Sequence, residues 1–102
     1  MSAGPITLVD AEEFNRQYPD SFEIPFGSDR ENVSVDDAAK VMFTDGTYVE
    51  RMWVRVTANS DDGYVGELDS APTILPMRSG EVVRFQARHI MALYFAGAGS
   101  TK

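Results

Sequence analysis

The sequence predicts a mainly β protein: a five-stranded, strongly bent antiparallel meander or SH3-like small barrel, preceded by a short N-terminal helix and an extended arm. Three observations support this fold class. Val49 to Thr57 alternate strictly between apolar and polar residues, which is the period of a half-buried strand. Asp45-Gly46, just before them, is a strong hairpin signal. The short Gln86-Ala87-Arg88 link resembles the single turn between the last two strands of SH3-like barrels.

A short helix is predicted near the start of the chain, after an unstructured lead-in from Met1 to Thr7. Asp10 is a good N-cap residue, and Glu13 follows three positions later, as in a capping box. Pro19 ends the helix after about two turns, because its ring cannot continue the helical hydrogen bonding.

An extended arm and a loop are predicted to connect this helix to the sheet. Phe22 to Phe26 carry alternating apolar residues, but Pro25 lacks a hydrogen-bond donor, so the segment suits an arm or an edge strand. Gly27 to Asp36 are mostly polar and show no periodicity, which is typical of a loop.

The rest of the chain is predicted to consist of strands and turns. Asn59 to Gly63 form a turn, and Gly66 inside the next apolar run indicates a bulge or a sharp bend. Thr73 to Met77 form a short irregular piece, after which Val83 and Phe85 share one face of a strand. The predicted strands are 40–44, 49–57, 64–68, 81–85 and 89–95.

Length and composition predict one domain over residues 1–102: helix, arm and loop in 8–36, the barrel core in 38–95, and a flexible tail in 96–102. Hydrophobic residues make up 43% and charged residues 25%, which are ordinary globular values. No apolar run approaches the roughly 20 residues of a membrane span. There is no cysteine and no basic segment followed by an apolar one at the N-terminus, so we expect a cytoplasmic protein without a secretory signal.

The charge balance is acidic, with a net charge of −7 at pH 7. Such a charge repels phosphate backbones, so nucleic acid is a disfavoured partner, whereas a basic protein would be attracted. A simpler interpretation is that the acidity keeps the protein in solution. The sequence does not predict an oligomeric state.

No catalytic, metal or cofactor motif is present. An EF-hand loop with its glycine at Gly63 would need an oxygen ligand at Ala58, and no phosphate-binding or dinucleotide-binding glycine motif occurs. His89 is the single histidine, so it cannot supply a zinc site, and no serine near it stands in a nucleophile context. We therefore predict a non-enzyme without cofactors or metals, with His89 as a partly packed rim residue.

The outward side of the strand around Trp53 is the candidate binding surface. Arg51, Trp53 and Arg55 point one way, and Met52 and its apolar neighbours point the other. Tryptophan and arginine dominate interaction hot spots. Arg84 and, more weakly, Tyr64 are added as candidate binding residues. In the alternative interpretation Trp53 is covered by the Phe22–Phe26 arm, with the arginines at its edges.

Several motifs together resemble a family of small bacterial proteins. They are Phe22-Glu23-Ile24-Pro25, Glu50-Arg51-Met52-Trp53-Val54, Gly66-Glu67-Leu68-Asp69 with Pro72, Gly80-Glu81-Val82-Val83-Arg84-Phe85, and His89-Ile90. The chain is similar to this family, which is catalogued as a domain of unknown function (number twenty-three fourteen), from Phe22 to Ile90. One departure is Asp36-Asp37, where the family leads us to expect a Gly-Asp turn. The resemblance implies no catalytic residues. The family is similar to other small bacterial domains that are interpreted as immunity proteins in toxin systems.

The function predicted from these observations is a non-catalytic protein-binding module that uses the Arg/Trp strand face. One form of it is an immunity-type binder of a basic partner. The alternative is a small-ligand or single-stranded nucleic-acid binder on the barrel face, because base-binding barrels place aromatic side chains beside basic ones.

Overall fold

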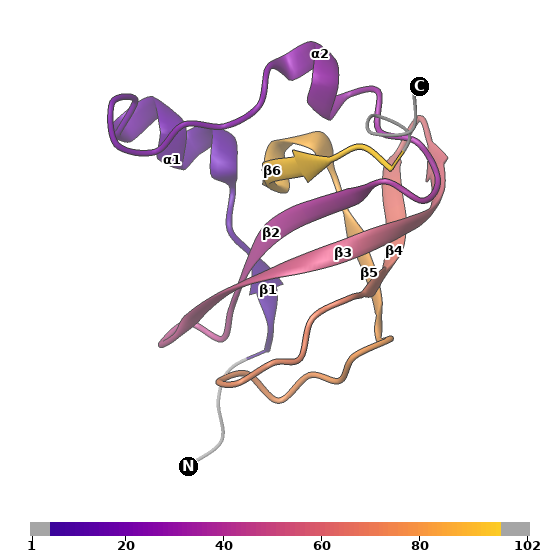
Figure 1. Cartoon of the computed structure of the whole chain (residues 1–102). Helices are drawn as coiled ribbons and strands as arrows, with labels where there is room; N and C mark the ends of the chain where they lie inside the picture. Colours follow the sequence, from indigo (N-terminus) through magenta and orange to yellow (C-terminus); the bar gives the residue numbers. More distant parts are fainter. Residues whose placement is uncertain (1–4, 97–102) are drawn as a thin grey trace.

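The computed structural model describes residues 5–96 and confirms the predicted fold class: a curled antiparallel sheet with a short helix near its start (Figure 1). The elements in chain order are β1 Thr7–Leu8, α1 Ala11–Gln17, α2 Gly27–Arg30, β2 Ala38–Thr44, β3 Val49–Ser60, β4 Gly63–Leu68, β5 Val82–Phe85, the 3-10 turn η1 Ala87–His89 and β6 Ile90–Tyr94. The predicted tail lies outside the described residues, except for Ala96. None of the helices within 5–96 is long and apolar enough to cross a membrane.

β2 holds the sheet together because both of its edges are paired. One edge pairs with β3 along its whole length, and the sheet continues through β4 to β5. The other edge is shared, since β6 pairs with residues 38–41 of β2 and β1 pairs with Phe43 and Thr44. The last strand therefore returns to the first long strand, as in SH3-like barrels. The lead-in prediction was wrong for Thr7, which belongs to β1.

β3 bends the sheet. Its first half pairs with β2 and its second half pairs with β4, so the strand belongs to both walls of the curl. The ladder between β3 and β4 shifts between Val56 and Ala58, which leaves Thr57 as the extra residue of a β-bulge. Gly66 is the partner of Val56, so the predicted bulge at Gly66 is confirmed, with the extra residue on the facing strand.

Several strand ends differ from the predicted ones. β2 begins at Ala38, and β3 continues to Ser60, which shortens the predicted Asn59–Gly63 turn to Asp61-Asp62. His89 lies in η1, although it was predicted to begin the last strand. The two extensions, in β2 and β3, arise because pairing with a neighbouring strand extends an element beyond the residues whose own pattern favours it. The last strand begins later than predicted because the His89 side chain caps the turn by accepting from the Gln86 N–H.

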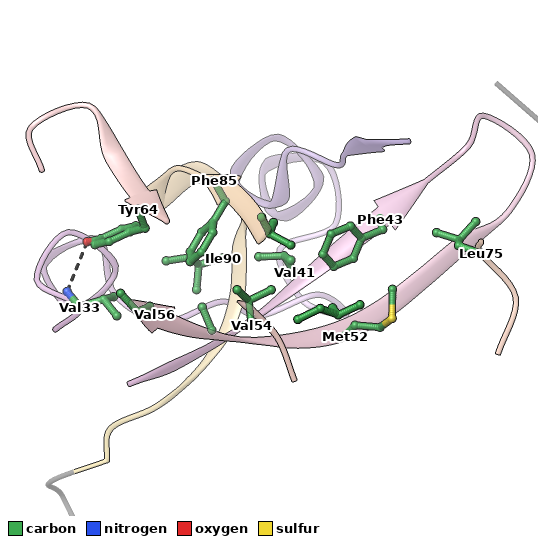
Figure 2. Close-up of a cluster of buried hydrophobic side chains, with 13 residues drawn as sticks. Val33, Val41, Phe43, Met52, Val54, Val56, Tyr64, Leu75, Phe85 and Ile90 are labelled. Atoms are coloured by element: carbon green, nitrogen blue, oxygen red, sulfur yellow. Dashed lines mark hydrogen bonds between the residues drawn. The ribbon is translucent and has the colours of Figure 1, made fainter. Parts of the chain in front are cut away.

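The main core lies inside the curl, and the period-two pattern determines which side chains enter it (Figure 2). Met52 and Val54 of β3 face Val41 and Ala39 of β2 across the ladder, and all four are buried. The predicted inward face of the Trp53 strand is thus confirmed. The buried residues of this core are Val33, Ala39, Val41, Phe43, Met52, Val54, Val56, Tyr64, Leu68, Leu75, Val83, Phe85 and Ile90.

A second, smaller cluster forms on the outer side of β2, under α1 and the arm. Ala11 of α1, Phe22 of the arm and Met42 of β2 are its buried members, and Ile24 and Met91 pack against them. The helix begins as predicted, because the Asp10 carboxylate accepts a hydrogen bond from the Glu13 N–H at 3.0 Å. The Phe22–Phe26 arm thus belongs to this cluster and forms no strand.

The predicted loop from Gly27 to Asp36 contains the one-turn helix α2, which places Arg30 at a buried junction. The Arg30 guanidinium forms an ion pair with Glu12 of α1 and donates to the carbonyl oxygens of Pro25 (2.9 Å) and Ala87 (3.2 Å). The Arg30 carbonyl accepts a hydrogen bond from the Tyr64 hydroxyl at 2.8 Å. One residue therefore connects α1, the arm, η1 and the sheet.

Asp36 takes the place where the family resemblance led us to expect a Gly-Asp turn. Its φ of 78° lies in the left-handed region, which suits glycine best and aspartate better than most other residues. The next residue, Asp37, is buried, and its carboxylate accepts hydrogen bonds from the N–H groups of Ser34 and Ala96, each at 2.9 Å. Asp36-Asp37 therefore forms the turn that leads into β2 without a glycine.

Glu50 at the start of β3 anchors the long loop between β4 and β5. Its carboxylate accepts hydrogen bonds from the N–H groups of Thr73 (2.7 Å), Ile74 (3.0 Å) and Leu75 (2.9 Å) and from the Thr73 hydroxyl. These bonds, chiefly those from the Thr73 and Leu75 backbone, lower the pKa of Glu50 to about 2. They also hold Leu75 where its side chain enters the main core.

Glu50 is expected to make the protein sensitive to acid. Because the folded state lowers its pKa from 4.5 to about 2, its stabilisation is complete above pH 4.5 and is lost as the pH falls toward 2. Glu50→Gln should cost about 1 kcal/mol at pH 7, the difference between hydrogen bonds to a charged and to a neutral acceptor. Urea denaturation of both proteins from pH 7 to pH 2 measures this. If the difference in unfolding free energy between the two proteins stayed constant from pH 7 to pH 2, the lowered pKa of Glu50 would be contradicted.

Candidate functional site

The candidate site is the outer face of β6, β2 and β3 that α1 and the arm leave uncovered. The strand register places Trp53 beside Lys40, and it places Arg55 and Tyr94 on either side of Ala38. Directly paired residues of antiparallel strands project to the same side. We call this surface the Trp53 face and define it by Lys40, Arg51, Trp53, Arg55 and Tyr94.

Trp53 lies at the centre of this face and is half-buried. Its backbone is fixed by the segment that follows β4: the N–H donates to the Ser70 hydroxyl at 2.9 Å, and the carbonyl accepts from the Asp69 N–H at 2.8 Å. The Lys40 ammonium lies 5.7 Å from the centroid of the indole ring, within the range of a cation–π contact. The ring is thus held in place while part of its surface stays accessible.

Two cations of the Trp53 face, Lys40 and Arg51, have no ion-pair partner among the described residues. Arg51 is exposed and lies two residues before Trp53 on the same side of β3. The Trp53 face is therefore locally positive, although the whole chain carries −7.

Arg55 belongs to the face, but its charge is already matched. The guanidinium forms ion pairs with Asp36 at 3.1 Å and with Glu67 of β4 at 3.2 Å, and 42% of its side chain is exposed. These pairs tie the turn before β2 to β3 and β4. Arg55 therefore offers a partner less charge than Lys40 or Arg51 does.

Tyr64 was wrongly added to the binding face, because the structure places its ring inside the curl. Only 7% of the residue is exposed, and its ring packs against Phe85 with 5.4 Å between centroids. The hydroxyl accepts a hydrogen bond from the Val33 N–H at 3.3 Å (Figure 2). Tyr64 shares the inward side of β4 with Gly66 and Leu68, so the alternation in that strand already contained the signal.

Arg84 lies on the outer side of the sheet but away from Trp53. It is exposed on β5 and pairs with Val65 of β4, so β4 lies between it and β3, the strand that carries Trp53. It lines a hollow with Arg88 and His89 instead. The structure thus brings together Arg51, Trp53 and Arg55, and it separates Arg84 from them.

The alternative interpretation placed Trp53 under the Phe22–Phe26 arm. In the structure Phe22 and Ile24 pack on the cluster around Met42, and Phe26 is 81% exposed. Among the described residues, the close aromatic pairs of the arm and helix join Phe14 to Tyr18 and to Phe22. The arm therefore covers the Met42 half of the outer face, and Trp53 lies in the other half.

Lys40 and Tyr94 belong to the face but were missed in the sequence. Lys40 lies on the side of β2 opposite the buried Val41, and Tyr94 is 63% exposed at the end of β6. A four-residue loop joins Thr44 to Val49 and sets the pairing of Lys40 with Trp53. A two-residue hairpin at Asp45-Gly46 would instead have paired Lys40 with Arg51, although on the same face.

His89 is half-buried, with its ring turned to the backbone. Its Nδ1 atom accepts a hydrogen bond from the Gln86 N–H at 3.0 Å, which closes the turn before β6. Burial, reinforced by the neighbouring Arg88 charge, lowers the pKa of His89 below its usual value. Within residues 5–96, no group of three or more His, Asp and Glu side chains is placed to hold a metal ion.

Comparisons of the chain with protein families, with curated proteins and with solved structures found no match. The resemblance to the family of unknown function therefore stays a prediction based on its motifs.

Proposed function

We propose that this protein is a non-catalytic binding module whose Trp53 face docks an acidic segment of a partner protein. The observation that carries the proposal is that Trp53 shares one face with Lys40, which lies against its ring, and with Arg51, and that both cations are without ion-pair partners among the described residues. An accessible indole supplies apolar contact area, and the cations supply charge-assisted hydrogen bonds to carboxylates.

The backbone geometry supports the same proposal. Trp53 stands on a central strand whose backbone is bonded on both edges, so little flexibility is lost when a partner binds. Tyr94 extends the surface along β6 with a second accessible ring. A cytoplasmic location is also part of the proposal and rests on composition alone. The immunity-type binder of a basic partner, which the family resemblance and the net charge suggest, is the competing form of the proposal.

The proposed binding can be tested with three polymers, because the single tryptophan reports on the face by fluorescence. Poly-L-glutamate at low salt is expected to change the Trp53 emission with saturation. Poly-L-lysine represents the basic partner that the net charge of −7 would attract. If only poly-L-lysine gave a saturating change in the Trp53 emission, the proposed acidic partner would be wrong and a basic partner would take its place.

Charge-removing variants make the test specific to the face. Replacing Lys40 and Arg51 together by glutamine should weaken poly-L-glutamate binding about tenfold, since two exposed charge contacts are lost. Replacing Arg78 and Arg84 together by glutamine is the matched control, because it also removes two charges and both arginines are exposed and lie outside the Trp53 face. Equal weakening by both variants would show that only the overall charge matters.

Single-stranded nucleic acid is the second candidate ligand. It is favoured by the two accessible rings, Trp53 and Tyr94, on one face beside Lys40 and Arg51. The acidic net charge opposes it, because backbone contacts would release few counterions. Titration of the Trp53 emission with oligothymidylate at low salt tests this candidate, and an unchanged signal removes it.

A further inference from the structure

A hollow beside the 3-10 turn contains three basic side chains that the Trp53 face does not use. Its volume is about 320 Å³, and it lies between the Asp61-Asp62 turn and the end of β5. Arg84, Arg88 and His89 are among its lining residues, together with Tyr64 and Phe85. Asp62 is the only acidic residue in this lining.

The walls of the hollow are connected by hydrogen bonds through Gln86. Its side-chain amide donates to the Asp62 carbonyl at 3.3 Å, and its side-chain oxygen accepts from the Arg88 guanidinium. Gly63 permits this close approach, because a Cβ there would lie 2.7 Å from the Phe85 carbonyl oxygen. The wall that carries Arg88 is therefore fixed relative to the opposite turn.

The hydrogen bonding of His89 determines which of its ring nitrogens can act as a donor. Since Nδ1 accepts from the Gln86 N–H, the proton of the neutral ring is on Nε2. Arg84 is exposed and has no ion-pair partner among residues 5–96, whereas Arg88 has Asp10 at 3.7 Å. The lining thus offers the Arg84 guanidinium and the His89 imidazole donor, together with Arg88, whose charge is partly matched by Asp10, against the Asp62 carboxylate.

We propose that this hollow binds a small oxyanion, a phosphate or carboxylate group, through Arg84, Arg88 and the Nε2–H of His89. Guanidinium groups match both kinds of oxyanion because their N–H donors form a planar fork. The open mouth of the hollow keeps the ligand in contact with water, so we expect millimolar affinity. The proposal is independent of the Trp53 face, which lies on β6, β2 and β3.

The test uses the imidazole proton signals of the single histidine in NMR. The full chain is titrated with sodium phosphate and, separately, with sodium acetate at pH 7.5 and constant ionic strength set with sodium chloride. The proposal expects a saturable shift of the His89 signals with at least one of the two anions, and the response identifies the preferred group. No saturable shift with either anion would overturn it.

Two variants connect the shift to the hollow. Arg84→Gln should weaken the anion affinity about fivefold, the effect of one partly exposed charge contact. Arg78→Gln should leave the affinity unchanged, because Arg78 is exposed but is not part of the lining. Undiminished affinity in Arg84→Gln would overturn the proposal, as would equal losses in both variants. Arg88→Gln repeats the test from the η1 side of the hollow.

Discussion

Replacing Arg30 by alanine is expected to lower the free energy of unfolding by about 3 kcal/mol. The guanidinium is nearly buried, and it bonds to Glu12, to the Pro25 carbonyl and to the Ala87 carbonyl at the same time. Its removal leaves these acceptors without their donor and takes away the connection between α1, the arm and η1. The value lies at the lower limit for a broken buried ion pair, because Glu12 retains some contact with water.

Thermal and urea denaturation of wild type and Arg30→Ala measure this loss, with a shift in Tm of roughly 12–20 °C for a domain of this size. Arg16→Ala is the matched control. Arg16 also pairs with a glutamate of α1, Glu13, but both side chains are more than half exposed, so its loss should cost at most about 0.5 kcal/mol. Equal, small losses in the two variants would show that Arg30 does not connect these elements.

Arg30→Lys separates the contribution of the positive charge from that of the planar arrangement of N–H donors. The ammonium keeps the positive charge near Glu12 but cannot donate in the planar fork that reaches both Pro25 and Ala87. An intermediate loss is expected. A lysine variant as stable as wild type would mean that the ion pair with Glu12 accounts for the whole effect.

The features predicted correctly from the sequence are those that neighbouring residues determine. Alternation around Trp53 fixes which side chains enter the core, and Asp10 with Glu13 fixes the start of α1. The hairpin at Asp45-Gly46 is local in the same sense, since the Asp45 carboxylate accepts hydrogen bonds from the N–H groups of Thr47 and Tyr48.

The features that were missed depend on contacts between distant parts of the chain. Arg30 reaches Ala87, 57 residues away, and Glu50 binds N–H groups 23 to 25 residues away. No periodic pattern marks such residues, because each is defined by backbone groups that the fold brings to it. The loop prediction for 27–36 therefore contained no role for Arg30.

The candidate site was predicted in part for the same reason. Arg51, Trp53 and Arg55 follow from alternation within one strand, but Lys40 and Tyr94 depend on the registers between strands. Arg84 was placed on the correct side of its strand, yet alternation contains no information on how far apart two strands lie. Arg84 therefore belongs to a separate basic hollow and not to the Trp53 face.

Gly66→Ala is expected to cost about 3 kcal/mol, because the bulge brings β3 against Gly66. An added Cβ would lie 2.5 Å from the Arg55 carbonyl oxygen and 2.5 Å from a methyl carbon of Val54. Neither atom can move cheaply, since the first belongs to the backbone of a central strand and Val54 is fully buried. The strands must separate, and this displaces the residues that directly follow Trp53.

Urea denaturation gives the change in unfolding free energy caused by Gly66→Ala. The Trp53 emission spectrum reports whether the Trp53 face has shifted. Gly27→Ala is the control, because a Cβ there meets only the end of the Arg30 side chain at 3.5 Å, an ordinary contact, and should change stability by less than about 0.5 kcal/mol. A loss below about 1 kcal/mol in Gly66→Ala would mean that β3 and β4 part easily. The bend of the sheet would then depend on core packing, and the position of Trp53 would not depend on the bulge.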